Sequence, residues 1–108
     1  MPLLPGVATP SDIMRGLSRG LSTFKFFPAG SLGGVPSLKA LAGPFPQVRF
    51  CPTGGITPSN LTDYLSLPNV IAAGGSWMVP ADPGAPGALE QATAQAREAM
   101  ALAGPARA

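Results

Sequence analysis

The sequence predicts an α/β fold built on a parallel sheet. Apolar, strand-length segments alternate along the chain with segments that have helical spacing, and this alternation is typical of strand–helix–strand units with right-handed crossovers. The strand segments are almost continuously apolar, as expected when both faces of a parallel sheet are covered. With 108 residues, the chain is predicted to form a single domain over residues 1–108.

Local signals predict where each element lies. Apolar runs bounded by Gly or Pro predict strands at residues 3–8, 23–27, 47–53 and 69–73. Helical spacing of apolar residues predicts helices at residues 10–19, 36–42, 57–65 and 88–103. The first helix follows Thr9 as its N-cap, with Pro10 at its first position. The last helix is predicted to be apolar along one face at Leu89, Ala92, Ala96 and Met100.

One stretch of the sequence recurs. Thr-Pro-Ser at residues 9–11 returns 48 positions later at residues 57–59, and the interval spans two strand–helix units. Thr-Pro-Ser is a good helix cap, so the recurrence is either a common cap or a true repeat. For a true repeat, each unit takes about 24 residues and eight units need roughly 200, near the low end for a closed (β/α)8 barrel. Four units form half a barrel, whose two open edges need a partner.

Composition excludes several classes of function. The formal charge is +2, and the seven basic residues form no stripe, so no nucleic-acid partner is expected. Cys51 is the single cysteine and there is no histidine, which excludes an internal disulfide, Ser-His and Cys-His catalysis and the usual zinc sites. No signal peptide and no membrane-spanning run is apparent, so a cytoplasmic protein without a membrane partner is expected.

Lys25 lies in the middle of an apolar, aromatic run, Phe-Lys-Phe-Phe-Pro-Ala at residues 24–29. Alternation along the strand places Thr23, Lys25 and Phe27 on one face. An ammonium group is costly to bury, and a lysine that loses its charge in an apolar pocket becomes a nucleophile for ketones. The alternative is a strand-end lysine that reaches water along its own alkyl chain.

Two pairs of glycines follow the last two predicted strands. Gly54 and Gly55 come directly after residues 47–53, and Gly74, Gly75 and Ser76 come directly after residues 69–73. Glycine lets the backbone approach an anion closely, and barrels frequently bind phosphate at the loops after their last two strands. The two pairs therefore predict a phosphate site, with ordinary turns as the alternative.

The remaining polar residues have weaker assignments. Cys51 shares a face with Thr53 and is predicted to be a small buried filler. Thr53, at the strand end, could bond a substrate oxygen or only cap the turn. Trp77 is predicted to pack against the core, and Arg49 is assigned no role. Five carboxylates lie on predicted helices or loops, so no general base shares the face of Lys25: Asp12, Asp63, Asp82, Glu90 and Glu98.

The motifs in combination resemble a known family. Residues 24–29, Arg-Phe-Cys-Pro-Thr-Gly-Gly-Ile at residues 49–56 and Gly-Gly-Ser-Trp at residues 74–77 are similar, in order and spacing, to the 2-dehydro-3-deoxy-phosphogluconate aldolase family. This family includes 4-hydroxy-2-oxoglutarate aldolases. Residues 3–7 with residues 9–11 resemble the family's fifth strand and helix cap. The resemblance covers residues 2–103 and implies strands five to eight, the C-terminal half, of a (β/α)8 TIM barrel.

The resemblance implies a homotrimeric class I aldolase without metal or organic cofactor. It implies cleavage of 2-dehydro-3-deoxy-6-phosphogluconate, a phosphorylated keto acid, to pyruvate and glyceraldehyde 3-phosphate. Lys25 matches the Schiff-base lysine, Phe27 lines its pocket and Thr53 lies beside the keto-acid group. The phosphate-binding positions after strands seven and eight match Gly54, Gly55, Gly75 and Ser76.

The sequence departs from the family pattern at its beginning. The family's proton-shuttling glutamate, and the arginine and threonine that hold the keto-acid carboxylate, lie on its first strands, which this sequence does not contain. The expectation is a truncated product, a misplaced start codon or a split gene, with weak or no turnover unless a missing N-terminal half complements it. The alternatives are a 4-hydroxy-2-oxoglutarate aldolase, a non-catalytic phosphate-binding half-barrel, and a relative of thiamine-phosphate synthase, which leaves Lys25 unexplained.

Overall fold

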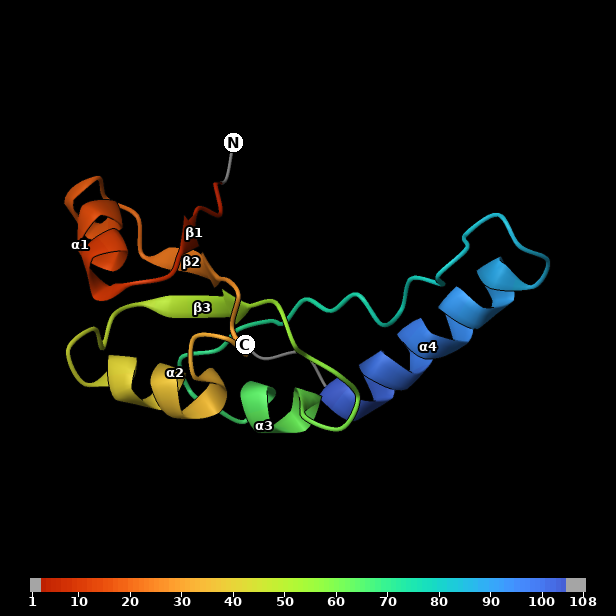
Figure 1. Ribbon diagram of the computed structural model, residues 1–108. Coiled ribbons are helices and arrows are strands. Elements are labelled where there is room, and N and C mark those ends of the chain that lie inside the picture. Colours follow the sequence, from red (N-terminus) through yellow and green to blue (C-terminus); the bar gives the residue numbers. More distant parts are fainter. Residues whose placement is uncertain (1–2, 105–108) are drawn as a thin grey trace.

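A computed structural model describes residues 3–104 and contains a parallel sheet with helices beside it (Figure 1). The sheet has the strand order β1 (Gly6–Val7), β2 (Thr23–Phe26) and β3 (Arg49–Pro52). The helices in the same residues are α1 (Pro10–Ser18), α2 (Gly34–Ala42), α3 (Leu61–Leu65) and α4 (Ala88–Ala103). The predicted α/β class with parallel pairing is therefore confirmed.

The first helix begins as the sequence predicts. Asp12 N donates to Thr9 Oγ1 at 3.1 Å, and Thr9 N donates back to Asp12 Oδ2 at 3.2 Å, so the two residues form a capping box. The second Thr-Pro-Ser does not repeat this cap. Thr57 N instead donates to Asn60 Oδ1 at 2.8 Å, and α3 begins only at Leu61. The predicted start of that helix at residue 57 is therefore wrong.

The predicted fourth strand, residues 69–73, is not a strand in the structure. The segment meets β3 through two isolated parallel bridges, Phe50 with Val70 and Thr53 with Gly74. Pro52 lies between them and has no N–H with which to continue the hydrogen-bond ladder. Between the two bridges, the segment advances four residues, from 70 to 74, whereas the facing chain advances three, from 50 to 53. The register therefore shifts by one residue. The segment still occupies the fourth position of the sheet.

The core lies on one face of the sheet. Phe24 and Phe50 are fully buried there, and α1 and α2 contribute Ile13 and Leu38 to the same cluster. The rings of Phe26 and Phe50 pack edge to face with their centroids 5.9 Å apart. On the other face of the sheet, alternate residues of β2 and β3 are only half-buried or exposed. The expectation that both faces are covered is therefore wrong for the described residues.

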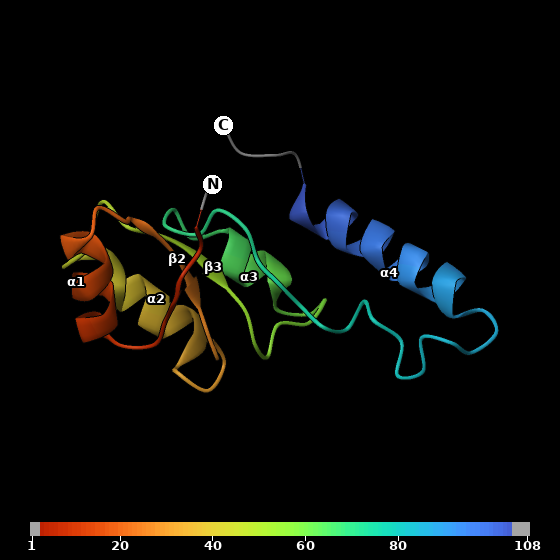
Figure 2. The same cartoon turned by 90° about the horizontal axis from the view of Figure 1, so that it is seen from above.

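The last helix lies apart from the sheet. Figures 1 and 2 show α4 at the end of a long irregular segment, and α3 is the element it packs against. Its half-buried residues are Ala92, Gln95 and Ala99, whereas Leu89 and Met100 are 76% and 70% exposed. The larger apolar residues of the predicted face, Leu89 and Met100, are therefore mostly exposed, and Ala99 is the α4 residue that packs against the core.

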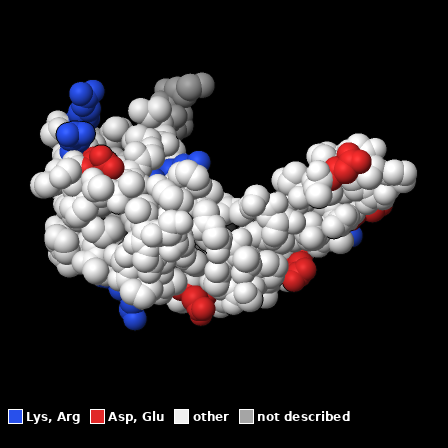
Figure 3. All heavy atoms as spheres, viewed as in Figure 1, with Lys and Arg blue, Asp and Glu red and all other residues white. Residues whose placement is uncertain are grey.

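Charged side chains are few and scattered. On the face shown in Figure 3, the Lys and Arg side chains lie at separate places and do not form a stripe. Within residues 3–104, no helix has the length and apolar character required to cross a bilayer.

Candidate functional site

Lys25 occupies the centre of the open face of the sheet. Its register partners are Gly6 on β1 and Cys51 on β3, and its backbone N–H donates to Pro5 O at 2.8 Å. The side chain is half-buried, and its Nζ lies 5.1 Å from the centroid of the Phe27 ring. An ammonium group over an aromatic face is held by the ring quadrupole. The predicted shared face of Lys25 and Phe27 is thus present, without a closed apolar pocket around the amine in the described residues.

Phe27 follows β2 and forms the outer wall of the site. Its backbone N–H donates to Val7 O at 3.3 Å, the side chain is 51% exposed, and the Phe27–Pro28 peptide bond is cis. Phe27 Cδ2 would lie 3.3 Å from a β-carbon built on Gly54. The Phe27 ring therefore lies between the lysine and the first glycine turn.

Cys51 and Thr53 lie on the same face as Lys25, at the carboxyl end of β3. Burial raises the pKa of the Cys51 thiol, while the charge of Lys25 and a hydrogen bond with the Thr53 side chain oppose that shift. Thr53 N donates to Phe26 O at 2.9 Å, and Thr53 O accepts from Ala29 N at 2.8 Å. Sequence reasoning placed Cys51 on the face of Thr53 but missed that it is the partner of Lys25. Aligning the prolines that follow the two aromatic runs, Pro28 and Pro52, would pair Lys25 with Arg49 instead, so that alignment does not give the observed register.

The first glycine turn has a conformation that other residues rarely adopt. Gly54 and Gly55 have φ angles of 100° and 73°, in the left-handed region. A β-carbon at Gly54 would lie 3.1 Å from Pro28 Cα, so the turn packs directly on the end of β2. Gly30 N donates to Gly54 O at 3.0 Å and ties the loop after β2 to this turn.

The second glycine turn lies next to the first. Thr53 and Gly74 are bridge partners, so the backbone at Gly75 and Ser76 leaves the sheet beside Gly54 and Gly55. A β-carbon at Gly75 would overlap the Trp77 ring, and the Ser76 side chain is exposed. A turn closed by Val79 N donating to Ser76 O follows, and the next helix starts only at Ala88. The structure thus brings both predicted glycine pairs together, although neither opens directly into a helix.

No carboxylate lies on the face of Lys25. The strands β1, β2 and β3 contain neither Asp nor Glu. The carboxylate nearest in sequence, Asp12, accepts hydrogen bonds from Ala8 N and Thr9 N at the start of α1. Within residues 3–104, no cluster of three His, Cys, Asp or Glu side chains is placed to hold a metal ion.

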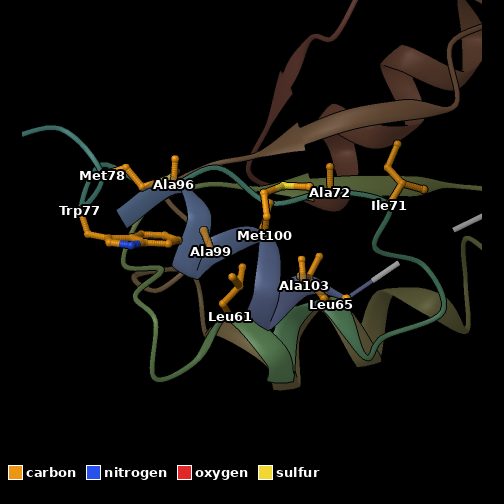
Figure 4. Close-up of a pocket in the computed structure, with 12 residues that line it drawn as sticks. Leu61, Leu65, Ile71, Ala72, Trp77, Met78, Ala96, Ala99, Met100 and Ala103 are labelled. Atoms are coloured by element: carbon orange, nitrogen blue, oxygen red, sulfur yellow. The ribbon is translucent and has the colours of Figure 1, made fainter. Parts of the chain in front are cut away.

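A separate apolar groove lies away from the lysine, between α3, α4 and residues 71–78 (Figure 4). Its volume is about 360 Å³ and its walls include Leu61, Leu65, Ile71, Trp77 and Met100. None of its lining residues is charged. Trp77 packs against the core as predicted, and among the described residues its Nε1 has no hydrogen-bond partner. The sequence did not predict this groove, because Met100 and Ile71 come from segments whose packing depends on where α4 settles.

Comparison with known proteins agrees on one family. Residues 1–94 match the family model described as KDPG and KHG aldolase. The KHG/KDPG aldolase of Escherichia coli is 56% identical over 100 residues, which are 93% of this chain and 47% of that protein. The chain therefore spans about half the length of the curated relatives it matches.

Solved structures give the same result. The 2-keto-3-deoxy-6-phosphogluconate aldolase of Zymomonas mobilis, in a crystal structure with 3-phosphoglycerate, aligns with a TM-score of 0.86 at 55% identity, covering 93% of this chain and 46% of that one. The KDPG aldolase of Legionella pneumophila, with pyruvate captured as a covalent carbinolamine, aligns with a TM-score of 0.80 at 49% identity, covering 94% and 48%. On its sequence motifs, its fold and these matches, the chain belongs to the KDPG and KHG aldolase family.

Proposed function

We propose that this chain carries the Schiff-base half of a class I aldolase site, with Lys25 as the nucleophile. The observation that carries the proposal is the position of Lys25 on the open sheet face, between Gly6 and Cys51 and one residue before the end of β2. Ligands of open parallel sheets bind outside the carboxyl ends of the strands. The pyruvate carbinolamine in the Legionella relative supports the same chemistry.

The proposed reaction cleaves 2-dehydro-3-deoxy-6-phosphogluconate to pyruvate and glyceraldehyde 3-phosphate. The neutral amine of Lys25 attacks the C2 ketone, and loss of water from the carbinolamine gives an iminium ion. A base removes the proton of the C4 hydroxyl as the C3–C4 bond breaks. The bonding electrons move toward the iminium nitrogen, which releases the aldehyde and leaves an enamine. Protonation at C3 and hydrolysis then release pyruvate and the free lysine.

The neighbouring residues have proposed binding roles. Phe27 covers the bound keto acid, with its ring 5.1 Å from Lys25 Nζ, and the Thr53 hydroxyl bonds the keto-acid group at the end of β3. The phosphate is proposed to rest on the two adjoining turns that contain Gly54, Gly55, Gly75 and Ser76. Gly54 and Gly55 have left-handed φ angles, and the absence of a side chain lets the backbone approach an anion closely. The 3-phosphoglycerate in the Zymomonas structure is consistent with a phosphate site in this family.

The proposal extends to the assembly. The three strands and the bridged segment at residues 69–74 are proposed to correspond to strands five to eight of a (β/α)8 barrel, completed by a complementary half and assembled as a homotrimer. The face of Lys25 carries no carboxylate to move protons. Loss of a general base typically costs about 10² to 10⁴ in rate, so the chain alone is expected to form the Schiff base and to turn over slowly.

The absence of that carboxylate also favours a second candidate, a phosphate-binding unit that does no chemistry. It uses the adjoining glycine turns and gives Lys25 no role. The two candidates differ in one observable, a covalent adduct at the lysine. The preferred aldol substrate within the family, a phosphorylated sugar acid or 4-hydroxy-2-oxoglutarate, is a separate question that turnover assays address.

The test is reductive trapping of pyruvate. The chain is incubated with pyruvate and sodium borohydride, and the modified residue is located by peptide mass spectrometry. Lys39, an exposed lysine on α2, supplies the matched control. We expect one reduced pyruvyl group at Lys25 in the native chain and in Lys39→Ala, and none in Lys25→Ala. Absence of the adduct, or equal labelling of Lys25→Ala, would overturn the aldolase proposal and leave the binding unit.

A further inference from the structure

The two sides of Lys25 are unequal. On one side its register partner is Gly6, which has no side chain, and a β-carbon there would meet nothing within 4 Å. On the other side its register partner is Cys51, whose half-buried side chain extends from the same face of the sheet. Neighbouring strands lie about 4.8 Å apart, so the thiol stands directly beside the stem of the lysine. Cys51 is therefore the one lateral side chain at this level of the sheet among β1, β2 and β3.

We propose that Cys51 is a specificity-determining residue, forming the side wall against which the substituent on the ketone carbon packs when a 2-keto acid is bound to Lys25. This inference rests on the proposed Schiff-base function. A carbon attached to the lysine amine carries a carboxylate and a second substituent. One of the two can extend toward the open side at Gly6, and the other must fit beside Cys51. The size of this side chain then limits which keto acids reach the amine.

The chemistry of Cys51 suits a wall better than a reacting group. Burial is the largest influence on its thiol and raises the pKa, so the side chain is neutral at physiological pH. Cys51 shares its face with Thr53, which lies at the carboxyl end of β3, where the substrate is proposed to bind. A neutral, polarizable sulfur fits an apolar substituent, and a thiol is smaller than any branched apolar side chain.

The neighbouring position on the same face provides a control. Thr23 lies two residues before Lys25 and pairs with Arg49, at the end of the strands away from the glycine turns. Its side chain is half-buried, like that of Cys51. A change of volume at Thr23 alters the same sheet face by a similar amount but lies on the far side of the lysine from the proposed substrate.

The experiment measures trapping by borohydride at Lys25 with pyruvate and with 2-oxobutyrate, which is one methylene larger. The ratio of the two trapping rates is compared for the native chain, Cys51→Ala, Cys51→Leu and the control Thr23→Leu. One methylene in a confined apolar site changes selectivity by roughly 10- to 200-fold. We expect the ratio of 2-oxobutyrate trapping to pyruvate trapping to rise about tenfold in Cys51→Ala, to fall by a similar factor in Cys51→Leu, and to stay unchanged in Thr23→Leu.

A reversible chemical modification of the native chain tests the same proposal without relying on variants that fail to fold. Methyl methanethiosulfonate adds a methylthio group to Cys51 in the folded native chain, which should suppress trapping of 2-oxobutyrate more than that of pyruvate, with recovery after reduction. If the native chain traps neither acid, the aldolase proposal itself fails, and this inference fails with it. If the native chain traps pyruvate but the ratio is the same in every variant and after modification, Cys51 is not the wall and the aldolase proposal stands.

Discussion

Thr53 and Gly74 are paired across the edge of the sheet so closely that no side chain fits freely at position 74. A β-carbon there would lie 3.1 Å from Thr53 Oγ1 and 3.4 Å from its Cγ2, and Gly74 N donates to Pro52 O at 2.9 Å. This pairing attaches the irregular segment after α3 to β3. It also sets the distance between the two glycine turns of the candidate phosphate site.

Substitution of Gly74 by alanine should push Thr53 out of place. The φ angle of Gly74 is outside the left-handed region, so the cost is the close contact and not backbone strain. Overpacking of this kind costs about 1–3 kcal/mol. We expect urea unfolding of Gly74→Ala to show a loss in this range. The double variant with Thr53→Ala should lose less than the sum of the single variants, because the contact is then gone. Strictly additive losses would show that the two residues are not coupled.

Substitution of Gly54 by alanine is expected to be destabilising for two reasons, a strained backbone and a close contact. Gly87, which has only the first of these, allows the two contributions to be measured separately. Gly54 and Gly87 both have left-handed φ angles, 100° and 82°, but only Gly54 has backbone atoms of its neighbours within contact. The left-handed conformation costs roughly 1–2 kcal/mol for a residue with a β-carbon. We expect Gly87→Ala to lose about this amount in urea unfolding and Gly54→Ala to lose at least 1 kcal/mol more. Equal losses would mean that the loop after β2 moves away from the turn without cost.

Much of the fold could be predicted because the signals are local. The alternation of Phe24, Lys25 and Phe26 fixes which side chains face the core, and Thr9 with Asp12 fixes the start of α1. The segment after α3 was harder because its pairing depends on a neighbour. Pro52 removes one donor from β3, and that loss interrupts the pairing of a segment in which Val70 and Ile71 favour a strand.

The candidate site also has some features that the sequence predicts and others that depend on packing. Lys25 and the two glycine pairs are visible in the sequence because their residue types are unusual for their positions. The partnership of Lys25 with Cys51 is a matter of register, which a sequence of short apolar strands does not specify by itself. The packing of α4 was also not predictable from the sequence, because Ala99 packs against the core whereas the larger Leu89 and Met100 are exposed.

Ser76 offers a direct test of the proposed phosphate site. Its exposed hydroxyl lies on the turn beside Gly54 and Gly55, where it can donate to a phosphate oxygen. Hydrogen bonds to charged groups contribute about 1.5–3 kcal/mol, so Ser76→Ala should bind 3-phosphoglycerate about tenfold or more weakly by calorimetry. Ser11→Ala, which removes an exposed hydroxyl from the start of α1, should bind it as the native chain does. An unchanged affinity in Ser76→Ala would remove this residue from the site.

Asp12 should make the stability of the chain depend on acid pH. The hydrogen bond from Ala8 N is the largest cause that lowers the pKa of the Asp12 carboxyl, with help from Thr9 and Arg15 and opposition from partial burial. A carboxyl with a lower pKa in the folded chain stabilises it above the unfolded pKa of about 3.9, and this stabilisation disappears as the pH falls through the folded pKa. Asp12→Asn should therefore unfold at lower urea than the native chain at pH 6, and the two midpoints should converge toward pH 2.

Because hydrogen bonds dominate the pKa shift of Asp12, most of the difference between the two midpoints at pH 6 should remain in 0.5 M salt, which screens the charge of Arg15. Midpoints that stay equally far apart from pH 6 to pH 2 would show that the capping carboxylate has no linked proton.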